Sequence, residues 1–366
     1  MTDLERTVLA LCEISSPTGN ESALCDLVEA RCVASVGRTA VARDGNNLVV
    51  RPTGVNNSFP TVLLAGHLDV VRTRHNGPPR LHSERLYGPG AADMKSGLGV
   101  MLHLLDDVAA GHRPFYSPVF VFYDREEGPY TDNGLGTVLA RFESLSRAVL
   151  AVCLEPSSNA LQLGCVGSLH ARVTFHGRTA HSARPWQGDN AIHKAGGVLQ
   201  RLAARTPRDV MIDGMLYREV MSATMAEGGR GRNVVPDSFA LNVNVRFAPG
   251  RSSDEALDDV LAVVAGEGTV EAMDRSPSAV PHGDHALVRA LVDAGVRGVE
   301  PKQAWTDVGR FAQHGIPAVN LGPGTQTQAH QEDEWTDRGA LAEGLNLFRR
   351  WMFETGDGGF SAPRGA

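Results

Sequence analysis

Three apolar runs constrain the fold of this chain more than any other feature. The runs are residues 61–65, 119–123 and 148–154, and each is almost continuously apolar. Such runs are typical of strands that are buried on both faces of a parallel sheet. These runs lead into ionisable side chains, which are His67 and Asp69, Glu126 and Glu127, and Glu155. Because the ligands of an open α/β sheet gather where strands end and loops begin, the sequence predicts an α/β fold with a polar site at the strand ends.

Two further candidates follow loops that contain glycine and proline. Asp93 comes shortly after Gly88-Pro89-Gly90, and His330 comes after Gly322-Pro323-Gly324. The candidate set is therefore His67, Asp93, Glu126, Glu127, Glu155 and His330. Five such residues suffice to hold two divalent cations around a shared carboxylate, which leaves one glutamate able to move a proton. This composition predicts a two-metal hydrolase.

The spacing of these residues indicates how such a site is organised. His67 and Asp69 point to the same side of an extended backbone, and Asp69 is a candidate partner that fixes the His67 tautomer, because metal-bound imidazoles commonly donate their other N–H to a carboxylate. Glu126 and Glu127 are adjacent, so they address one point only if the backbone turns there. If Glu127 binds metal, Glu126 can reach the attacking water and act as a general base.

The pattern changes from about Leu169 onwards. Half-polar strands are predicted at residues 169–176, 219–226 and 239–247, with helices near 190–204 and 253–266. This α+β order is typical of a smaller domain inserted into the first one. We therefore predict a discontinuous catalytic domain of residues 1–167 and 281–366 and an inserted domain of residues 168–280. The small residues of 356–366 predict disorder.

Composition limits the class of protein. A chain of 366 residues exceeds what one core usually organises. The net charge of −7 argues against nucleic acid or an anionic membrane as a partner. No apolar run approaches the roughly 18 residues of a spanning helix, and no basic segment followed by an apolar one opens the chain, so we expect a cytoplasmic protein. The five cysteines lack a Cys-x-x-Cys spacing and are expected to be buried thiols.

Together these motifs resemble the M20 family of metallopeptidases and acylases along nearly the whole chain. The resemblance rests on residues 66–71, 88–97, 124–128, 153–156 and 180–183. Within the family, the sequence is most similar to the succinyl-diaminopimelate desuccinylases of the actinobacterial type, through residues 181–186, 233–237 and 305–308. The resemblance implies a zinc-exopeptidase-like catalytic domain with a mixed, mostly parallel sheet, and an inserted ferredoxin-like α+β lid that also dimerises.

The resemblance also implies a role for each candidate residue. Asp93 would bridge two zinc ions, with cobalt or manganese as alternatives. His67 and Glu155 would complete one site, and Glu127 and His330 the other. Glu126 would take a proton from the water and later deliver it to the departing amine. In family members a lid histidine from the other subunit of a dimer stabilises the oxyanion; here that residue would be His181, assisted by Asn233.

The substrate expected from the resemblance is an N-acyl amino acid, above all N-succinyl-LL-2,6-diaminopimelate. A diacid amide needs cationic or hydroxyl partners. The candidates to meet its carboxylates are Arg184, Arg246, Lys302 and Thr306. Better-known desuccinylases have a basic residue where this chain has Val166, and a valine cannot bind a carboxylate. An acylamino-acid deacylase or dipeptidase of specialised metabolism on the same scaffold is therefore an alternative.

Functions of other classes make different predictions. A non-catalytic binding protein on this scaffold should not hold about two divalent ions per chain, so metal analysis would identify it. A serine hydrolase would need a Gly-x-Ser-x-Gly elbow, which the sequence lacks, and would survive a chelator. Nucleotide binding has little support, because the sequence contains neither a phosphate-binding Gly-x-x-x-x-Gly-Lys-Ser/Thr loop nor a convincing Gly-x-Gly-x-x-Gly motif after a strand.

Overall fold

The structure is a computed structural model that describes residues 1–56 and 58–354. It divides into two compact units. The first unit contains residues 1–163, 282–300 and 310–366, and the second contains residues 164–281 and 301–309. The short segment 301–309 therefore groups with the second unit, whereas the sequence analysis placed it in the catalytic domain. The disorder predicted for residues 356–366 lies outside the described residues.

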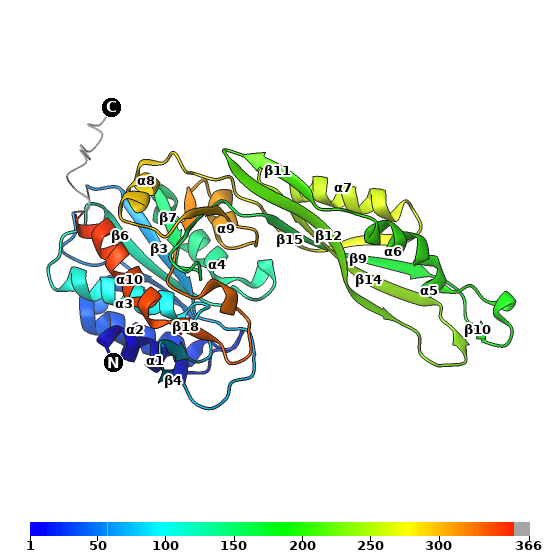
Figure 1. Cartoon of the computed structure of the whole chain (residues 1–366), viewed down its shortest axis with the longest axis horizontal. Helices are drawn as coiled ribbons and strands as arrows, with labels where there is room; N and C mark the ends of the chain where they lie inside the picture. The colour runs from blue at the N-terminus through cyan, green and yellow to red at the C-terminus, as the bar shows by residue number, and fades with distance from the viewer. Residues whose placement is uncertain (57, 355–366) are drawn as a thin grey trace. The chain divides into compact units, whose positions relative to one another are not determined.

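A mixed sheet forms the centre of the first unit (Figure 1). Within the described residues the strand order is β1-β2-β6-β3-β7-β17-β8-β16. The strands are β1 (Val41–Asp44), β2 (Asn47–Val50), β6 (Ser117–Tyr123), β3 (Thr61–His67), β7 (Leu150–Cys153), β17 (Ala318–Asn320), β8 (Leu161–Leu163) and β16 (Val299–Pro301). The central strands β6, β3, β7 and β17 are parallel, and the neighbouring β2 and β8 run antiparallel to them. The apolar runs thus form the buried parallel strands predicted for them.

Helices pack against this sheet and against each other. The helices of the unit are α1 (Asp3–Glu13), α2 (Ser22–Val36), α3 (Lys95–Ala109), α4 (Gly134–Arg141), α8 (Ala286–Asp293) and α10 (Arg338–Arg349), while α9 (Val308–Gln313) spans the boundary at 309. Helices α1, α2 and α10 all contact α3, which contacts β3. Thr2 caps the N-terminus of helix α1, where its side chain and that of Glu5 form a reciprocal capping box. No described helix has the length and apolarity needed to cross a membrane.

A small three-stranded sheet completes the first unit. Its order is β18-β5-β4, with β18 (Trp335–Asp337), β5 (Arg85–Tyr87) and β4 (Arg80–His82). All of its pairs are antiparallel, and Trp335 lies opposite Tyr87. This pairing brings the chain just after His330 next to the loop that leads to Asp93. The sequence analysis did not predict these short strands.

The second unit is an antiparallel sheet with helices over one face. Its strand order is β11-β12-β14-β9-β15. The strands are β11 (Arg208–Ile212), β12 (Met215–Gly228), β14 (Ser238–Phe247), β9 (Gly167–His176) and β15 (Thr269–Ser276), and β10 (Ala180–His181) pairs separately with β13 (Val234–Val235). The helix predicted at residues 190–204 is divided at Ala195 into α5 (Ala191–Lys194) and α6 (Gly196–Ala203).

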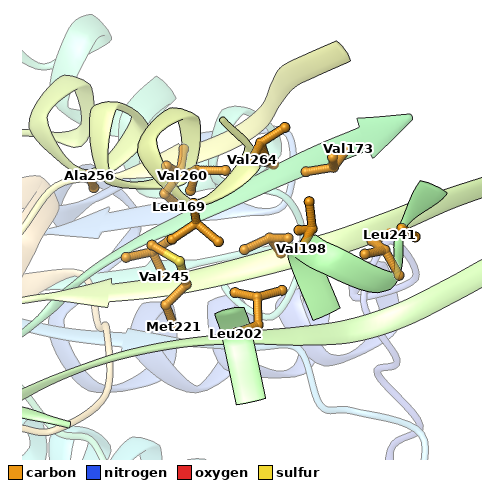
Figure 2. Packing of buried hydrophobic residues seen from close by; sticks show 14 of the residues in the cluster. Leu169, Val173, Val198, Leu202, Met221, Leu241, Val245, Ala256, Val260 and Val264 are labelled. Carbon is orange, nitrogen blue, oxygen red and sulfur yellow. The ribbon is translucent and has the colours of Figure 1, made fainter. Parts of the chain in front are cut away.

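The core of this unit lies between the sheet and helices α6 and α7 (Ser253–Val264). Figure 2 shows Leu169 and Val245 from the strands packed beside Val198 and Val260 from the helices. Because side chains alternate along a strand, the residues between these core positions face the opposite side of the sheet. Arg246 is one of these residues.

Candidate metal centre

The carboxyl ends of three parallel strands bring most of the predicted residues together. In the register of the sheet, His67 lies opposite Tyr123 and Ala65 lies opposite Cys153. The segments that follow these positions therefore start from the same end of the sheet. They carry Asp69, Glu126 and Glu127, and Glu155.

One group of potential ligands consists of His67, Asp93 and Glu155. Their ligand atoms all lie within 4.8 Å of one another, and all three residues are buried. The Nε2 atom of His67 is 3.2 Å from Oδ1 of Asp93 and 4.0 Å from Oε1 of Glu155. Burial lowers the pKa of His67, but the bonds to Asp69 and Asp93 outweigh it and raise this pKa well above its usual value.

A second group consists of Asp93, Glu127 and His330, whose ligand atoms also lie within 4.8 Å of one another. Nε2 of His330 is 2.7 Å from Oε1 of Glu127 and 3.5 Å from Oδ2 of Asp93. The hydrogen bond to Glu127 raises the pKa of His330 to about 9. The two groups therefore share Asp93, which presents one carboxylate oxygen to each histidine.

Asp93 reaches this position because the helix that follows it begins close to the segment after β7. The residue lies just before α3, and a side chain at Gly97 in the first turn would place its Cβ 2.3 Å from the carbonyl oxygen of Leu154. Glycine at this position thus allows the start of α3 to approach the segment that carries Glu155. Upstream, Gly90 adopts a φ of +77°, which favours glycine.

The adjacent Glu126 and Glu127 address one region because the backbone turns there. Arg125 has a φ of +58°, and the N–H of Gly128 donates to the carbonyl of Arg125 at 3.4 Å. Carboxylate oxygens of both glutamates lie within 4.8 Å of each other and of a ring nitrogen of His67. A turn at this pair is the condition that the sequence analysis set for a joint role.

Asp69 contacts His67, which is its predicted partner, and other residues of the site as well. Nδ1 of His67 lies 3.0 Å from the carbonyl oxygen of Asp69 and 3.4 Å from its Oδ1. The Asp69 carboxylate also accepts the N–H groups of Glu126 and Glu127, each at 3.0 Å, and the hydroxyl of Thr18 at 3.0 Å. Burial raises the pKa of Asp69, but His67 and these N–H groups outweigh it, so the pKa is lowered. Asp69 therefore fixes both the histidine and the glutamate turn.

Glu334 is a functional candidate that sequence reasoning missed. This buried carboxylate accepts the backbone N–H groups of Gly90, Ala92 and Asp93. Burial, together with the nearby charge of Asp93, raises the pKa of Glu334 to about 7. Thr18 was missed as well. Glu334 and Thr18 follow neither an apolar run nor a motif in the sequence, so only their contacts in the structure identify them as parts of the site.

The chemistry of the two groups fits divalent metal ions. Imidazole nitrogens and carboxylate oxygens are the ligands that zinc and similar ions take. Asp93, Glu127 and Glu155 bring three carboxylates into a small and largely buried volume, where like charges repel strongly unless cations are present. The described residues thus form a candidate dinuclear metal site.

The remaining predicted residues belong to the second unit. His181 is exposed on the β10–β13 ribbon, where its Nδ1 accepts the N–H of Ala183 at 3.1 Å. Asn233 is next to it, since its carbonyl accepts the N–H of Ser182 at 2.9 Å. Arg184 is exposed, and Thr306 is buried with a hydroxyl that has no hydrogen-bond partner among the described residues.

Arg246 lines a cavity of about 410 Å³ in the second unit, together with Leu216, Arg218, Val220 and Gln303. Burial lowers the pKa of Arg246. Arg218 forms an ion pair with Asp209 at 2.7 Å, whereas Arg246 has no acidic partner within the described ranges. Arg246 therefore brings an uncompensated positive charge to a half-buried position.

Comparison with known proteins identifies the family. The model of peptidase family M20/M25/M40 matches residues 63–354. A putative succinyl-diaminopimelate desuccinylase of Mycobacterium tuberculosis is 42% identical over 344 residues, which cover 94% of this chain and 96% of that protein. The chain belongs to the M20 family. It is a hydrolase, as the residues of the candidate site had indicated.

Other M20 proteins extend the comparison. The succinyl-diaminopimelate desuccinylase of Corynebacterium glutamicum is 37% identical over 351 residues, with 94% of each chain covered. The YXEP protein of Bacillus subtilis, described as a dinuclear metal-binding peptidase of the M20 family, has a similar fold with a TM-score of 0.66. It is 14% identical, and the likeness covers 95% of this chain and 96% of that one. This M20 hydrolase thus has the α/β fold with a mixed, mostly parallel sheet that the sequence predicted.

Proposed function

We propose that this M20 hydrolase is a succinyl-diaminopimelate desuccinylase, which hydrolyses the amide bond of N-succinyl-LL-2,6-diaminopimelate to succinate and LL-2,6-diaminopimelate in lysine biosynthesis. The observation that carries the proposal of metal-dependent hydrolysis is that two groups of metal-competent side chains share Asp93, with Glu126 beside them. The substrate is proposed from the desuccinylases of Mycobacterium tuberculosis and Corynebacterium glutamicum.

The proposed metal ligands are the two groups described above. His67, Asp93 and Glu155 would hold one ion, and Asp93, Glu127 and His330 the other. Zinc is our proposal for both ions because two histidines and three carboxylates suit it. When bound, such ions lower the pKa of a water molecule towards about 7 and polarise the amide carbonyl.

Side chains of the chain itself would move the protons. Glu126 has its carboxylate near the ring nitrogen of His67 and is not needed as a ligand in either group, so we assign to it the acceptance of a proton from the attacking water. It would then return this proton to the nitrogen of the departing amine, which leaves as a neutral amino group. Asp69 would keep Glu126 in place through the bond to its backbone N–H.

We further propose that His181 stabilises the tetrahedral oxyanion in the site of a second copy of the chain, with Asn233 beside it. The long strand β12 supports a homodimer. Among the described residues, its positions 220–228 pair with β14 on one side, whereas β11 covers only positions 215–219 on the other. An uncovered strand edge pairs readily with another strand, so a second copy could extend the sheet here.

Substrate carboxylates are proposed to meet the second unit. Arg246 offers a cation that has no acidic partner in the described part of the chain, in a cavity large enough for a carboxylate. A guanidinium binds carboxylates in bidentate geometry. Thr306, with its unpaired buried hydroxyl, and the exposed Arg184 are further candidates. Arg246→Gln should raise KM for a diacid more than Arg218→Gln does, because Arg218 is already paired with Asp209.

One observation favours an alternative substrate class. Val166, which stands where better-known desuccinylases have a basic residue, is fully buried in a cluster with Tyr217 and Ala248. It cannot contribute to binding a succinyl carboxylate. An acylamino-acid deacylase or dipeptidase activity on the same scaffold is therefore the second candidate.

A substrate panel distinguishes the two candidates. The zinc-loaded protein is offered N-succinyl-LL-2,6-diaminopimelate, N-acetyl and N-succinyl amino acids, and dipeptides, with chelator-treated enzyme as the control. We expect the highest kcat/KM for the succinylated diaminopimelate and loss of activity in the chelated sample. A higher kcat/KM for acetylated amino acids or dipeptides would favour the alternative, and full activity after metal removal would contradict both.

A further inference from the structure

Glu334 connects the segment that carries His330 to the loop that carries Asp93. It is four residues after His330, and its own backbone carbonyl accepts the N–H of Gly88 at 3.1 Å. This contact continues the pairing of β18 with β5, which ends at Tyr87. The backbone of Glu334 is thus fixed beside the start of the loop that leads to Asp93.

The Glu334 side chain then binds that loop at three points. Oε2 accepts the N–H of Gly90 at 3.0 Å, while Oε1 accepts the N–H of Ala92 at 2.7 Å and that of Asp93 at 2.8 Å. The residue is 4% exposed. Both oxygens are used as acceptors, so the carboxylate form fits the loop better than an amide, which would turn a donor towards one of these N–H groups.

The loop that Glu334 holds carries the residue common to both proposed metal sites. Asp93 directs Oδ1 to His67 and Oδ2 to His330. A small movement of the Asp93 backbone would therefore disturb both sites together. Because His330 is on the same segment as Glu334, the carboxylate also couples the position of one terminal ligand to that of the shared ligand.

We propose that Glu334 is a positioning residue that orients Asp93, and with it both metal sites, through the three backbone N–H groups of residues 90, 92 and 93. The inference rests on the proposed metal function of Asp93. It does not make Glu334 a ligand. Residues that orient metal ligands typically change metal affinity by about 10–100-fold when they are replaced.

Cobalt titration of Glu334→Gln tests this inference. Co²⁺ serves as the probe because its visible spectrum reports ligand geometry, and Glu332→Gln, an exposed neighbour on the same segment, is the matched control. We expect the Glu334 variant to bind both Co²⁺ ions about 10–100-fold more weakly with an altered spectrum, and the control to match the wild type. A residue that only stabilised the fold would lower the melting temperature and leave the spectrum of the loaded protein unchanged.

Two outcomes separate this inference from the proposed function. If Glu334→Gln binds two Co²⁺ ions with wild-type affinity and spectrum, the positioning role is overturned and the metal proposal stands. If the wild type itself binds no Co²⁺ at these residues, the proposed function fails.

Hydrogen exchange of the metal-free wild type tests the contact without any variant that might fail to fold. The amides of Gly90, Ala92 and Asp93 should exchange slowly because all three donate to Glu334. Rapid exchange of these three amides would contradict the inference.

Discussion

We assign different tasks to Glu126 and Glu127, although they are adjacent in the sequence. Glu127 pairs with His330 at 2.7 Å and belongs to the group with Asp93. Glu126 is outside both groups that share Asp93, but its carboxylate lies near His67. The turn at Arg125 gives the two side chains these separate positions. At the scale of single residues, the account therefore predicts that neighbouring substitutions have unlike effects.

Glu126→Ala should fold and bind two metal ions normally but lose at least about 10² in turnover, because it removes the general base. Glu127→Ala is the matched comparison and should lose metal as well as activity. Metal content by mass spectrometry and kcat on the best substrate measure the two effects. Retained turnover in Glu126→Ala would remove this residue from its role.

Metal binding should depend on pH through His330. Since the Glu127 contact raises the pKa of His330 to about 9, this histidine is protonated in the metal-free protein at pH 7. Metal ions must displace that proton and the proton favoured on His67, whose pKa is also raised, so affinity should rise with pH across the neutral range. Calorimetric titration in two buffers of different ionisation enthalpy should detect proton release at pH 7. Affinity that stays flat between pH 6 and 8 would argue against this coupling.

At the scale of elements, the site depends on the parallel strands β3, β6 and β7, whose carboxyl ends lie at the same edge of the sheet. The strand register places His67 opposite Tyr123, and Asp69 then ties the loop after β3 to the glutamate turn after β6. His67 is the last residue of β3. The other metal-competent residues come from loops, and the sheet determines where the loops after β3, β6 and β7 start.

Asp69→Asn tests this link between two loops. The amide nitrogen would face at least one of the backbone N–H groups of Glu126 and Glu127, or Thr18, so we expect a loss of about 10–100-fold in kcat/KM. Thr18→Val keeps the shape and removes one of the three bonds, at a net cost of about 1 kcal/mol, and should lower kcat/KM much less. Steady-state kinetics and metal content measure both variants. Equal effects of the two substitutions would contradict the assigned role of Asp69.

Sequence reasoning found the elements whose pattern is strong. The continuous apolar runs became β3, β6 and β7, because strands buried on both faces need apolar side chains at every position. It did not find β5 and β18, whose three residues are too short to show a period. Glu334 was missed because its role depends on contacts between segments far apart in the sequence, which no local pattern indicates.

At the scale of the whole molecule, the role that we propose for His181 involves two copies of the chain. His181 and Glu126 lie in different units of the chain, and we propose that each site uses the histidine of its partner. His181→Ala and Glu126→Ala homodimers should both be inactive. Mixed dimers should recover part of the activity, since one of the two sites then has both residues.

Subunit exchange must be shown before the mixing experiment is interpreted. Native mass spectrometry of differently tagged protomers demonstrates exchange, and a mixture of Glu126→Ala with Glu127→Ala, which removes residues of the same unit, is a matched control. Absence of recovery in exchanged His181→Ala and Glu126→Ala dimers would refute action across subunits. A monomer in sedimentation experiments would refute it directly.

The central claim is that five side chains hold two cations that share Asp93. Anomalous diffraction at the zinc edge from crystals of the zinc-loaded protein tests it most directly. We predict two peaks, one contacted by His67 and Glu155 and the other by Glu127 and His330, with Asp93 contacting both. A single peak, or two peaks of which one lacks Asp93, would contradict the account.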